Sequence, residues 1–410
     1  MNVHRRFGLF AVACVLAVSS LAVHAPRAQG DTVPGVTSNE ILLGGTHPFS
    51  GPASAYGAIG KGIDAYFAYV NAKGGVYGRK IVYKDVDDAY NPPQTVQLTK
   101  QLVEQDHVLA MFNTLGTPPN LAIRPYLNEQ HVPQLFLATG ATTWATDAAK
   151  YPWTLGFNPD YQAEAEIFAK NILAHNPGAK IAVLYQNDDF GQDYVTGLQK
   201  GLGAKAGQIV KTASYEVTDP DVRSQMEALK ASGADTLVIA ATPKFAVQSL
   251  VARGQLGWKA TTYLTDVSAS QQIMHAATGA GGNGATDGVI TAEYTLDPTN
   301  PSLADTPGMK LYREIVSKYA PGVDPSNAFV LYGVAVAYTM TDALEKAGKS
   351  LTRESLMQAA LHLNEKNPFF FPGIELRTSP SDRFPIRSEQ LARYEGGLFV
   401  PIGPVIDARK

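Results

Sequence analysis

Residues 41–75 read ILLGGTHPFSGPASAYGAIGKGIDAYFAYVNAKGG, and this stretch predicts a strand, a loop of small residues and an amphipathic helix. The β-branched and leucine run at 41–43 is typical of a buried strand. Apolar residues recur three or four positions apart from Ile59 to Val70, which favours a helix that the following glycine pair ends. Because small residues leave backbone N–H groups accessible at a helix start, the loop suits a carboxylate ligand.

The first 30 residues have the pattern of a secretory signal peptide. Arg5 and Arg6 precede an apolar run at 7–23, no acidic residue occurs, and small residues follow up to position 30. We therefore expect cleavage between 25 and 30. Cys14 lies inside the apolar run and is the only cysteine of the chain, so the mature protein would have no disulfide and no thiolate metal site.

The length of the chain favours two domains. Its 410 residues, less the leader, exceed the roughly 250 to 300 residues at which single cores stop growing. The 34 Lys and Arg and 37 Asp and Glu give a formal net charge of −3, which becomes more negative without the arginines of the leader. This balance excludes a generally cationic protein that binds nucleic acid or a membrane surface.

Apolar strands and helical patterns alternate along the chain at the spacing of βαβ units, which favours an α/β fold with parallel sheets. The predicted strands of a first series lie at 41–43, 81–86, 108–112 and 134–137. Those of a second series lie at 181–185, 209–215, 236–240, 262–264 and 289–294. Two or three further helices are expected near 309–319, 326–347 and 352–362, before a hairpin turn at 396–397. This order fits one Rossmann-like lobe, a second lobe, and a return to the first.

Motifs of enzymes and cofactor sites are weak in this chain. Residues 279–284 read GAGGNG and match the dinucleotide fingerprint, but a strand follows them where a helix should. Residues 343–350 read ALEKAGKS, like a P-loop, yet Gly348 is more simply a helix C-cap. No nucleophile elbow occurs, and no two histidines after residue 30 have metal-ligand spacing. We therefore expect no catalytic residue, no metal site and no cofactor.

Loops after the predicted strands carry a candidate ligand site. Thr117 follows the strand at 108–112, and the loop at 138–144 follows the next strand, so their hydroxyl groups and backbone donors would meet at one sheet edge. Threonine capping and a buried Trp144 are the alternative interpretation. Asp266 follows a strand of the second series, where helix capping and pairing with a ligand's ammonium group are equally open.

The mature chain resembles the periplasmic binding proteins of ABC importers, specifically the branched-chain amino-acid-binding group with the type I fold. The segments at 47–81, 87–106 and 183–194 carry the likeness, together with the loops TLGTPPN and ATGATT. The resemblance implies two Rossmann-like α/β lobes with parallel central sheets, joined by a three-segment hinge and closing on a ligand. The implied division is a signal peptide at 1–30, lobe 1 at 31–158 and 290–373, and lobe 2 at 159–289 and 374–410.

The resemblance also implies which residues contact the ligand. It places Tyr56 beside the ligand and the ligand's carboxylate against Thr117 and the turn at 140–142. In lobe 2 it puts Phe190 and Thr242 where amino-acid binders have tyrosines, and Asp266 where they have a glutamate. These departures favour a hydrophobic or aromatic carboxylate as an alternative to a branched-chain amino acid. The expected ligand residues are Tyr56, Thr117, Gly140, Ala141, Thr142, Phe190, Thr242 and Asp266.

The expected function is that of a periplasmic solute receptor and not of an enzyme. It would capture a small carboxylate by lobe closure and deliver it to an ABC permease in the inner membrane. We expect a monomer that binds no nucleic acid. Two alternatives stay open: a ligand-sensing subunit for a receptor kinase or chemoreceptor, and a secreted hydrolase that would turn the bound compound over.

Overall fold

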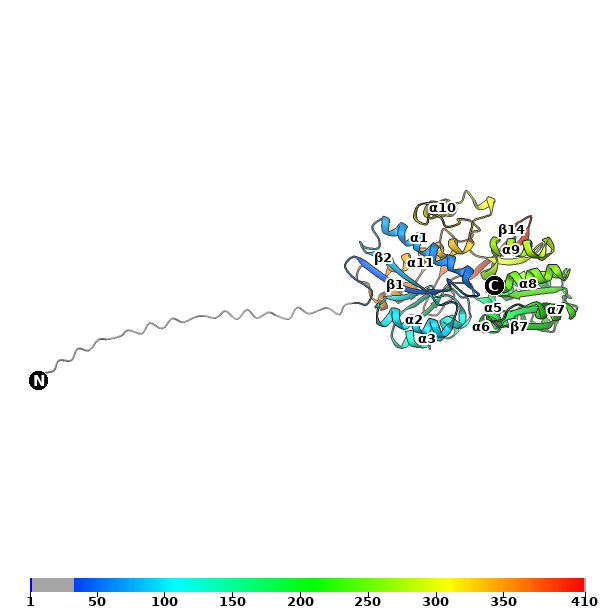
Figure 1. The fold of residues 1–410 in the computed structure, drawn as a ribbon, viewed down its shortest axis with the longest axis horizontal. Coiled ribbons are helices and arrows are strands. Elements are labelled where there is room, and N and C mark those ends of the chain that lie inside the picture. Colours follow the sequence, from blue (N-terminus) through cyan, green and yellow to red (C-terminus); the bar gives the residue numbers. More distant parts are fainter. Residues whose placement is uncertain (2–32, 409–410) are drawn as a thin grey trace. The chain divides into compact units, whose positions relative to one another are not determined.

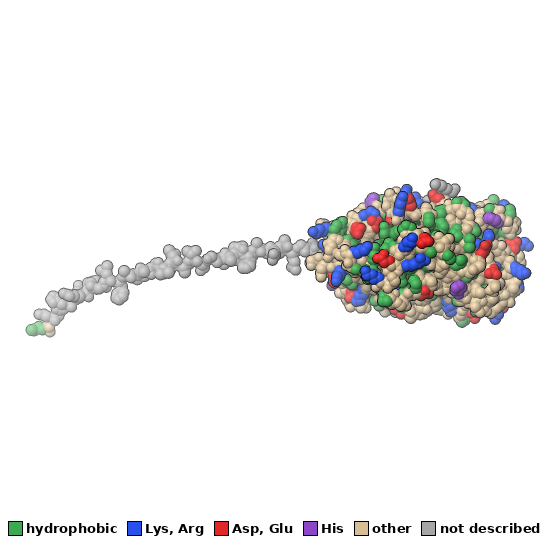
Figure 2. Space-filling view, turned by 90° about the horizontal axis from the view of Figure 1, so that it is seen from above, with side chains coloured by type: hydrophobic (Ala, Val, Ile, Leu, Met, Phe, Trp, Pro, Cys, Tyr) green, Lys and Arg blue, Asp and Glu red, His purple; other side chains and the backbone are tan. Residues whose placement is uncertain are grey.

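The computed structural model describes Met1 and residues 33–408. The expected signal peptide therefore lies, apart from Met1, outside the described residues. Among the helices of the described part, none combines the length and the apolarity that crossing a bilayer requires. Charged side chains of both signs are interspersed on the face shown in Figure 2.

The first half of the chain builds a parallel five-stranded sheet in the order β2-β1-β3-β4-β5 (Figure 1). Its strands are β1 (Glu40–His47), β2 (Lys80–Asp87), β3 (Ala110–Phe112), β4 (Gln134–Leu137) and β5 (Thr154–Gly156). The helices between them are η1 (Ser54–Gly57), α1 (Ala58–Ala72), α2 (Pro92–Glu104), α3 (Thr117–Glu129) and α4 (Thr143–Thr146). Helix α1 covers one face of the sheet, while α2 and α3 pack on the other face around Met111. Both faces are thus buried, as the apolar strands require.

The second sheet has seven strands in the order β14-β13-β10-β9-β8-β6-β7, antiparallel only at the β13 and β14 edge. Its strands are β6 (Ile181–Gln186), β7 (Ile209–Tyr215), β8 (Thr236–Ala240), β9 (Thr261–Leu264), β10 (Ile290–Glu293), β13 (Ser388–Glu395) and β14 (Leu398–Asp407). The helices are α5 (Tyr161–His175), α6 (Asp189–Leu202), η2 (Gly203–Gln208), α7 (Arg223–Ala231), α8 (Pro243–Gln255), η3 (Asp266–Ser268), α9 (Gln271–Gly281) and η4 (Asn283–Ala285). Along β8, Leu237 and Ile239 face the helices α7 to α9, whereas Val238 and Ala240 face α5 and α6.

The chain passes between the two sheets three times within 33–408: after β5, after β10 and before β13. Between the second and third passages lie η5 (Pro301–Leu303), α10 (Pro307–Tyr319), α11 (Ala328–Ala347), α12 (Arg353–Ala360) and the small sheet of β11 (Asn364–Glu365) and β12 (Leu376–Arg377). The second piece of lobe 1 was predicted to begin at residue 290, but this residue starts β10, and β10 pairs within the second sheet. The second passage therefore follows residue 293.

Helices α1 and α11 approach each other at a pair of glycines. A Cβ atom on Gly333 would lie 2.1 Å from the carbonyl oxygen of Ile59, and one on Gly62 would lie 2.1 Å from that of Val330. Only glycine permits this distance between the two backbones. The contact fixes α11 to the layer of the first sheet.

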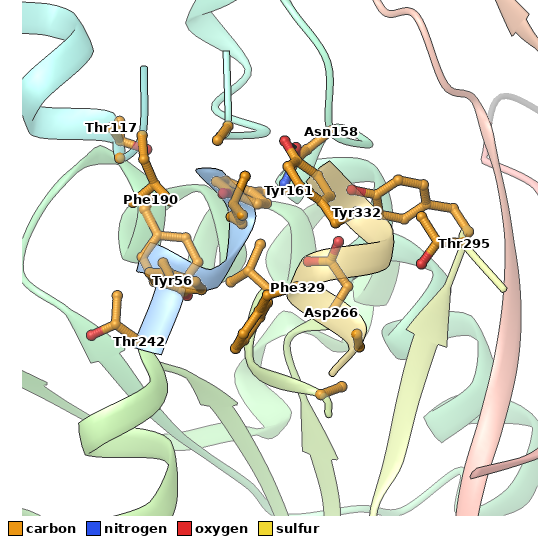
Figure 3. Close-up of a pocket in the computed structure, with 18 of the residues that line it drawn as sticks. Tyr56, Thr117, Asn158, Tyr161, Phe190, Thr242, Asp266, Thr295, Phe329 and Tyr332 are labelled. Carbon is orange, nitrogen blue, oxygen red and sulfur yellow. Dashed lines mark hydrogen bonds between the residues drawn. The ribbon is translucent and has the colours of Figure 1, made fainter. Parts of the chain in front are cut away.

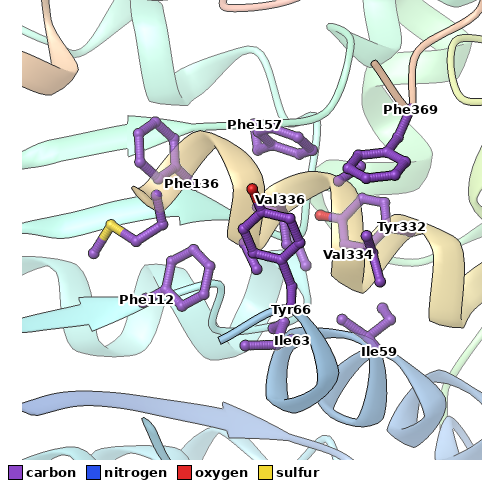
Figure 4. Close-up of a cluster of buried hydrophobic side chains, with 14 of the residues drawn as sticks. Ile59, Ile63, Tyr66, Phe112, Phe136, Phe157, Tyr332, Val334, Val336 and Phe369 are labelled. Atoms are coloured by element: carbon purple, nitrogen blue, oxygen red, sulfur yellow. The ribbon is translucent and has the colours of Figure 1, made fainter. Parts of the chain in front are cut away.

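Beneath this contact lies the core of the first sheet. Ile63 from α1 and Val336 from α11 share one cluster with the strand residues Phe112 and Phe136 (Figure 4). The rings of the two phenylalanines meet edge to face with their centroids 6.5 Å apart. All four side chains are buried. This packing holds α11, the helix that also carries lining residues of the cavity described below.

Strand β5 and helix α9 are among the elements that were not predicted from the sequence. The three-residue strand β5 is too short to show a period. Helix α9 includes the first three residues of the GAGGNG run, and Gly282 ends this helix with φ 73°. The run is therefore a helix end and not a dinucleotide turn. Gly348 caps α11 with φ 85°, which confirms its prediction as a C-cap.

Candidate functional site

A cavity opens at the carboxyl ends of the strands of both sheets. It encloses about 720 Å³ of empty space, part of which is open to solvent. Residues after all five strands of the first sheet line it, as do residues after β6, β8, β9 and β10. Ligands bind at this edge of open α/β sheets. The lining residues are Tyr56, Ile59, Tyr90, Leu115, Gly116, Thr117, Ala138, Asn158, Tyr161, Phe190, Thr242, Asp266, Val267, Ala269, Tyr294, Thr295, Ala328, Phe329 and Tyr332.

Aromatic rings make up much of the wall. The rings of Tyr56 and Phe329 meet edge to face with centroids 5.1 Å apart, and those of Tyr161 and Phe190 do so at 4.9 Å. Figure 3 shows Phe190 between Thr117 and Tyr56. No lysine or arginine is among the described residues that line the cavity. The walls therefore suit an apolar body, and the few polar groups decide which head group fits.

Thr117 brings a hydroxyl group to the wall of the first sheet. Its Oγ1 lies 2.6 Å from Oγ1 of Thr139, and Thr117 is the first residue of α3. The helix can begin here because Gly116 has φ 94°, and a Cβ atom on Gly116 would lie 2.4 Å from the ring of Tyr90. Pro118 and Pro119 come next and have no N–H, so the first turn of α3 offers an anion the N–H and the hydroxyl of Thr117.

Asp266 lines the cavity from the second sheet. It follows β9 directly, and its backbone N–H donates to Oε1 of Glu164 at 3.0 Å. Burial raises the pKa of Asp266 to about 6. Above that pH the carboxylate is ionised and offers an acceptor to a positively charged group of a ligand.

Two buried acids lie behind Asp266. Glu164 and Glu389 each bring a carboxylate oxygen within 4.8 Å of the other and of Asp266, and the hydroxyl of Tyr194 donates to Glu164. Burial, and then the charge of Asp266, raises the pKa of both glutamates well above its ordinary value. The three carboxyl groups are close enough to hold a cation, but the raised pKa values favour shared protons instead.

Thr242 directs its polar groups into the second sheet. Its hydroxyl donates to Oε1 of Gln186 at 3.2 Å, and its N–H donates to Oη of Tyr215 at 3.0 Å. Gln186 also donates from Nε2 to Oη of Tyr90 at 3.3 Å. Since Tyr90 follows β2 and Gln186 ends β6, this hydrogen bond joins the two sheets at the side of the cavity.

A smaller cavity adjoins the first one at Asp266. It holds about 410 Å³ of empty space, and both cavities share Asp266, Ala269, Tyr294, Thr295 and Ala328. Its own lining includes Glu293 and Asp297. Burial and the charge of Asp297 raise the pKa of Glu293 to about 8. Acidic side chains therefore line the smaller cavity, as Asp266 does the first one.

Comparison of the sequence with known families decides the family. The model of the family described as periplasmic binding protein matches residues 40–397 of the 410. The chain belongs to the periplasmic binding protein family. Members of this family are solute-binding proteins of the periplasm, and the family prediction made from the sequence is confirmed.

Relatives and solved structures agree with this periplasmic binding protein assignment. Leu/Ile/Val-binding protein homolog 7 of Brucella abortus (strain 2308) is 24% identical over 335 residues, which cover 80% of this chain and 82% of that protein. The structure of a branched-chain amino acid ABC transporter from Thermus thermophilus with bound valine is 20% identical with a TM-score of 0.78, over 91% of this chain and 97% of that one.

Two further structures carry other ligand names. A fatty acid ABC transporter substrate-binding protein from Thermomonospora curvata is 23% identical with a TM-score of 0.77, over 92% and 95% of the two chains. An ABC transporter solute-binding protein from R. palustris in complex with benzoate is 18% identical with a TM-score of 0.74, over 90% and 98%. At these identities the likeness concerns the fold. The predicted fold class, two α/β lobes with parallel sheets and three crossings, is confirmed.

The structure brings only some of the predicted ligand residues of this periplasmic binding protein together. Those that line the cavity are Tyr56, Thr117, Phe190, Thr242 and Asp266. Those that do not are Gly140, Ala141 and Thr142. Of the residues predicted to hold the carboxylate, Thr117 lines the cavity and the turn at 140–142 does not.

That turn packs against the segment after β5 and against α6. The hydroxyl of Thr142 donates to Asp160, and its N–H donates to Oδ2 of Asp193 at 2.9 Å. A Cβ atom on Gly140 would lie 1.9 Å from the carbonyl oxygen of Pro159. Ala141 is buried, with its N–H 3.4 Å from Oγ1 of Thr139. These residues are held by protein neighbours, so their polar groups serve the local packing.

Other lining residues were missed from the sequence. Asn158 follows β5, and a polar residue after a strand would have been a signal had this strand been predicted. Tyr332 and Phe329 lie on the apolar helix α11, and Tyr294 follows β10. Aromatic residues in such positions look like ordinary core, so nothing in the sequence sets them apart.

Proposed function

We propose that this chain is a periplasmic solute-binding receptor that captures a small carboxylate and delivers it to an ABC permease of the inner membrane. The ligand would be a hydrophobic amino acid or a hydrophobic or aromatic carboxylic acid. The chain would be exported by the signal peptide at 1–30 and act as a monomer. We take lobe 1 as 31–158 with 294–373, and lobe 2 as 159–293 with 374–410.

One observation carries this proposal: strand ends of both sheets line the same cavity. Tyr56 and Thr117 belong to the first sheet, whereas Phe190 and Asp266 belong to the second. A ligand that contacts both sets does so only while the lobes are together. The ligand therefore stabilises the closed form relative to the open form by the free energy of the contacts that only the closed form makes. A permease that recognises the closed form would then receive a receptor with its ligand bound.

The polar groups suit a ligand with a negative and a positive end. Thr117 would hold the carboxylate with its hydroxyl and its own backbone N–H at the start of α3. Ionised Asp266 would accept from an ammonium group, and the aromatic rings would cover the apolar part. A carboxylic acid without an ammonium group would use the same corner while Asp266 is protonated. Valine and benzoate, bound in two structures of similar fold, represent these two ligand types.

A thermal-shift and calorimetric panel tests this function. Leucine, valine, phenylalanine, benzoate and octanoate would be added to the protein without residues 1–30. Binding at one hundred times Kd stabilises a protein by about 2.7 kcal/mol, which gives a measurable rise in Tm. A panel in which no compound raises Tm or gives heat would contradict the proposal. Mass spectrometry of the recovered ligand should find it unchanged, whereas a product would favour the hydrolase.

Two threonine variants locate the carboxylate. Thr117→Val should weaken binding about tenfold or more, because a hydrogen bond to a charged group is lost. Thr142→Val is the matched control. It removes the bond to Asp160 and should lower Tm without changing affinity. Equal affinities of the wild type and Thr117→Val would place the carboxylate elsewhere.

A further inference from the structure

We infer that the side-chain amide of Asn158 is a hydrogen-bond donor to the ligand's carboxylate, and that a buried chain of hydrogen bonds ending at His47 holds it in that orientation. This inference rests on the proposed function, since it names a further contact of the same ligand. It supplies the second donor that the turn at 140–142 does not bring to the cavity.

The orientation is set first at Asn113, behind the cavity wall. Its Nδ2 donates to the carbonyl oxygen of Phe136 at 2.7 Å and to Oη of Tyr332 at 3.2 Å. Both hydrogens of the amide are thus used, and Oδ1 is left as an acceptor. This oxygen lies 3.3 Å from Nε2 of His47, so that nitrogen must carry a hydrogen.

His47 completes the buried end of the chain. Its Nδ1 lies 2.9 Å from both carboxylate oxygens of Asp85, so it must carry a hydrogen as well. With a hydrogen on each nitrogen the ring is an imidazolium, which cannot accept a hydrogen bond at either nitrogen. The residue is fully buried and cannot exchange these partners for water. The carbonyl oxygen of Phe136 and the N–H of His47 therefore both require the same orientation of the Asn113 amide.

Tyr332 passes this direction on to the cavity. Its hydroxyl oxygen accepts from Asn113, and its single hydrogen goes to Oδ1 of Asn158 at 2.9 Å. The acceptor end of the Asn158 amide is thereby occupied. Nδ2 keeps both hydrogens and has no hydrogen-bond partner among the described residues, while Asn158 lines the cavity beside Tyr332 (Figure 3).

The position of Asn158 suits a carboxylate that also contacts Thr117. Asn158 follows β5 and Thr117 follows β3, and β4 lies between these two strands in the sheet. The carboxyl ends of parallel strands lie at one edge of a sheet, and β3 and β5 are two strand spacings of about 4.8 Å apart. Two donors would then approach the head group from two sides, with one lobe supplying both.

Pairs of acids and amides of the same shape test this role. The probes are benzoate with benzamide, and leucine with leucinamide, titrated by calorimetry. The wild type should prefer each acid. Asn158→Asp keeps the acceptor for Tyr332 but replaces the donor by a carboxylate, so it should lose about tenfold or more in affinity for the acid and prefer the amide. Asn158→Leu should have a smaller preference for the acid without reversing it, since Thr117 is still present.

Tyr332→Phe tests the positioning chain, since it removes the hydroxyl group and keeps the ring. The ratio of acid to amide affinity should fall about threefold or more, with the amide affinity unchanged. Tyr312→Phe is the matched control: it removes another buried tyrosine hydroxyl, on α10 outside the cavity, and should leave the ratio as it is.

The outcomes separate this inference from the proposed function. If the wild type binds an acid of the panel and both Asn158 variants bind it equally well, the inference is contradicted and the receptor function stands. An unchanged ratio in Tyr332→Phe contradicts the positioning chain. If the wild type binds none of the acids or amides, the proposed function itself is contradicted.

Discussion

The backbone N–H of Asp266 donates to Oε1 of Glu164 at 3.0 Å, so an acid that lines the ligand cavity is tied to an acid in the core. Glu389 lies within the same 4.8 Å group. Like charges this close cannot all be ionised in a buried place, and protons are retained on the group near neutral pH. The floor of the cavity therefore changes its charge with pH.

Ligand affinity should depend on pH through Asp266, whose pKa is raised to about 6 by burial. Above this pH the carboxylate is ionised and pairs with an ammonium group. The affinity for leucine should fall as the pH is lowered from 7.5 to 5, while that for benzoate should not fall. Calorimetry at several pH values measures both. In Asp266→Asn the affinity for leucine should be low at every pH, and a pH dependence like that of the wild type would contradict the assignment.

The buried acid Glu389 should make folding stability fall with rising pH. Its pKa is raised by burial in the folded state, so its stabilising proton is present below the ordinary pKa of a glutamate and is lost as pH rises towards the folded value. Glu389→Gln lacks this dependence. The Tm of the variant minus that of the wild type should grow between pH 5 and pH 9.

The matched control for this measurement is Glu129→Gln, at an exposed glutamate that ends α3. Its Tm difference from the wild type should stay constant over the same pH range. A constant difference for Glu389→Gln as well would show that Glu389 is ionised in both states.

The protonated side chain of His47 should stabilise the fold at low pH and lose this contribution at high pH. Burial lowers its pKa, but the charge and hydrogen bond of Asp85, together with Asn113 and Asp88, outweigh burial and raise the pKa above 6.5. The contribution is complete below pH 6.5 and is lost as pH rises through the folded value. Asp88 and Asp64 also lie near His47 and act with Asp85. The Tm advantage of the wild type over Asp85→Asn should therefore be larger at pH 6 than at pH 9.

Asp305→Asn provides the comparison for Asp85→Asn. Asp305 is almost fully exposed and pairs with Lys310 at the surface, at 3.3 Å. Exposed pairs of this kind contribute little. Its Tm difference should be small at both pH values, and a Tm difference for Asp85→Asn that did not shrink with rising pH would speak against the imidazolium.

The contact between α1 and α11 should not tolerate a methyl group. Gly333→Ala would put Cβ 2.1 Å from the carbonyl oxygen of Ile59, and overpacking of this kind costs about 1–3 kcal/mol of unfolding free energy. Since α11 carries Phe329 and Tyr332, ligand affinity should fall as well. Urea unfolding and calorimetry measure the two effects.

Gly279→Ala is the control for Gly333→Ala, because Gly279 lies inside α9 and a Cβ atom there meets nothing within 4 Å. Alanine in a helix interior is more stable than glycine by up to about 1 kcal/mol. The variant should be as stable as the wild type or more so. If Gly333→Ala behaved in the same way, the two helices would not be in backbone contact.

Most of the fold could be predicted because its strands are buried on both faces. Runs such as 135–137 and 237–240 are apolar throughout, and turns with Gly, Pro or Asp separate them from helices with a clear period. The short strand β5 has neither length nor pattern, since its three residues are held by pairing with β4. Its absence from the prediction hid the loop that carries Asn158.

The site was predicted only where a loop directly follows a strand that could be recognised. Thr117 and Asp266 are of this kind. Thr142 looked equivalent, but a carboxylate 18 residues later, at Asp160, and another at Asp193 take its polar groups. These hydrogen bonds form because of the way α5 and α6 pack, and a local sequence pattern cannot predict that packing. Tyr332 lies on a buried helix, where only the tertiary structure separates a cavity wall from core.

The most direct test of the central claim is a crystal structure of the protein with the panel compound that binds it best. We expect the compound between the two sheets, with its carboxylate at Thr117 and its apolar part between Tyr56 and Phe190. Electron density for the compound at any other place, with this cavity holding only water, would contradict the account.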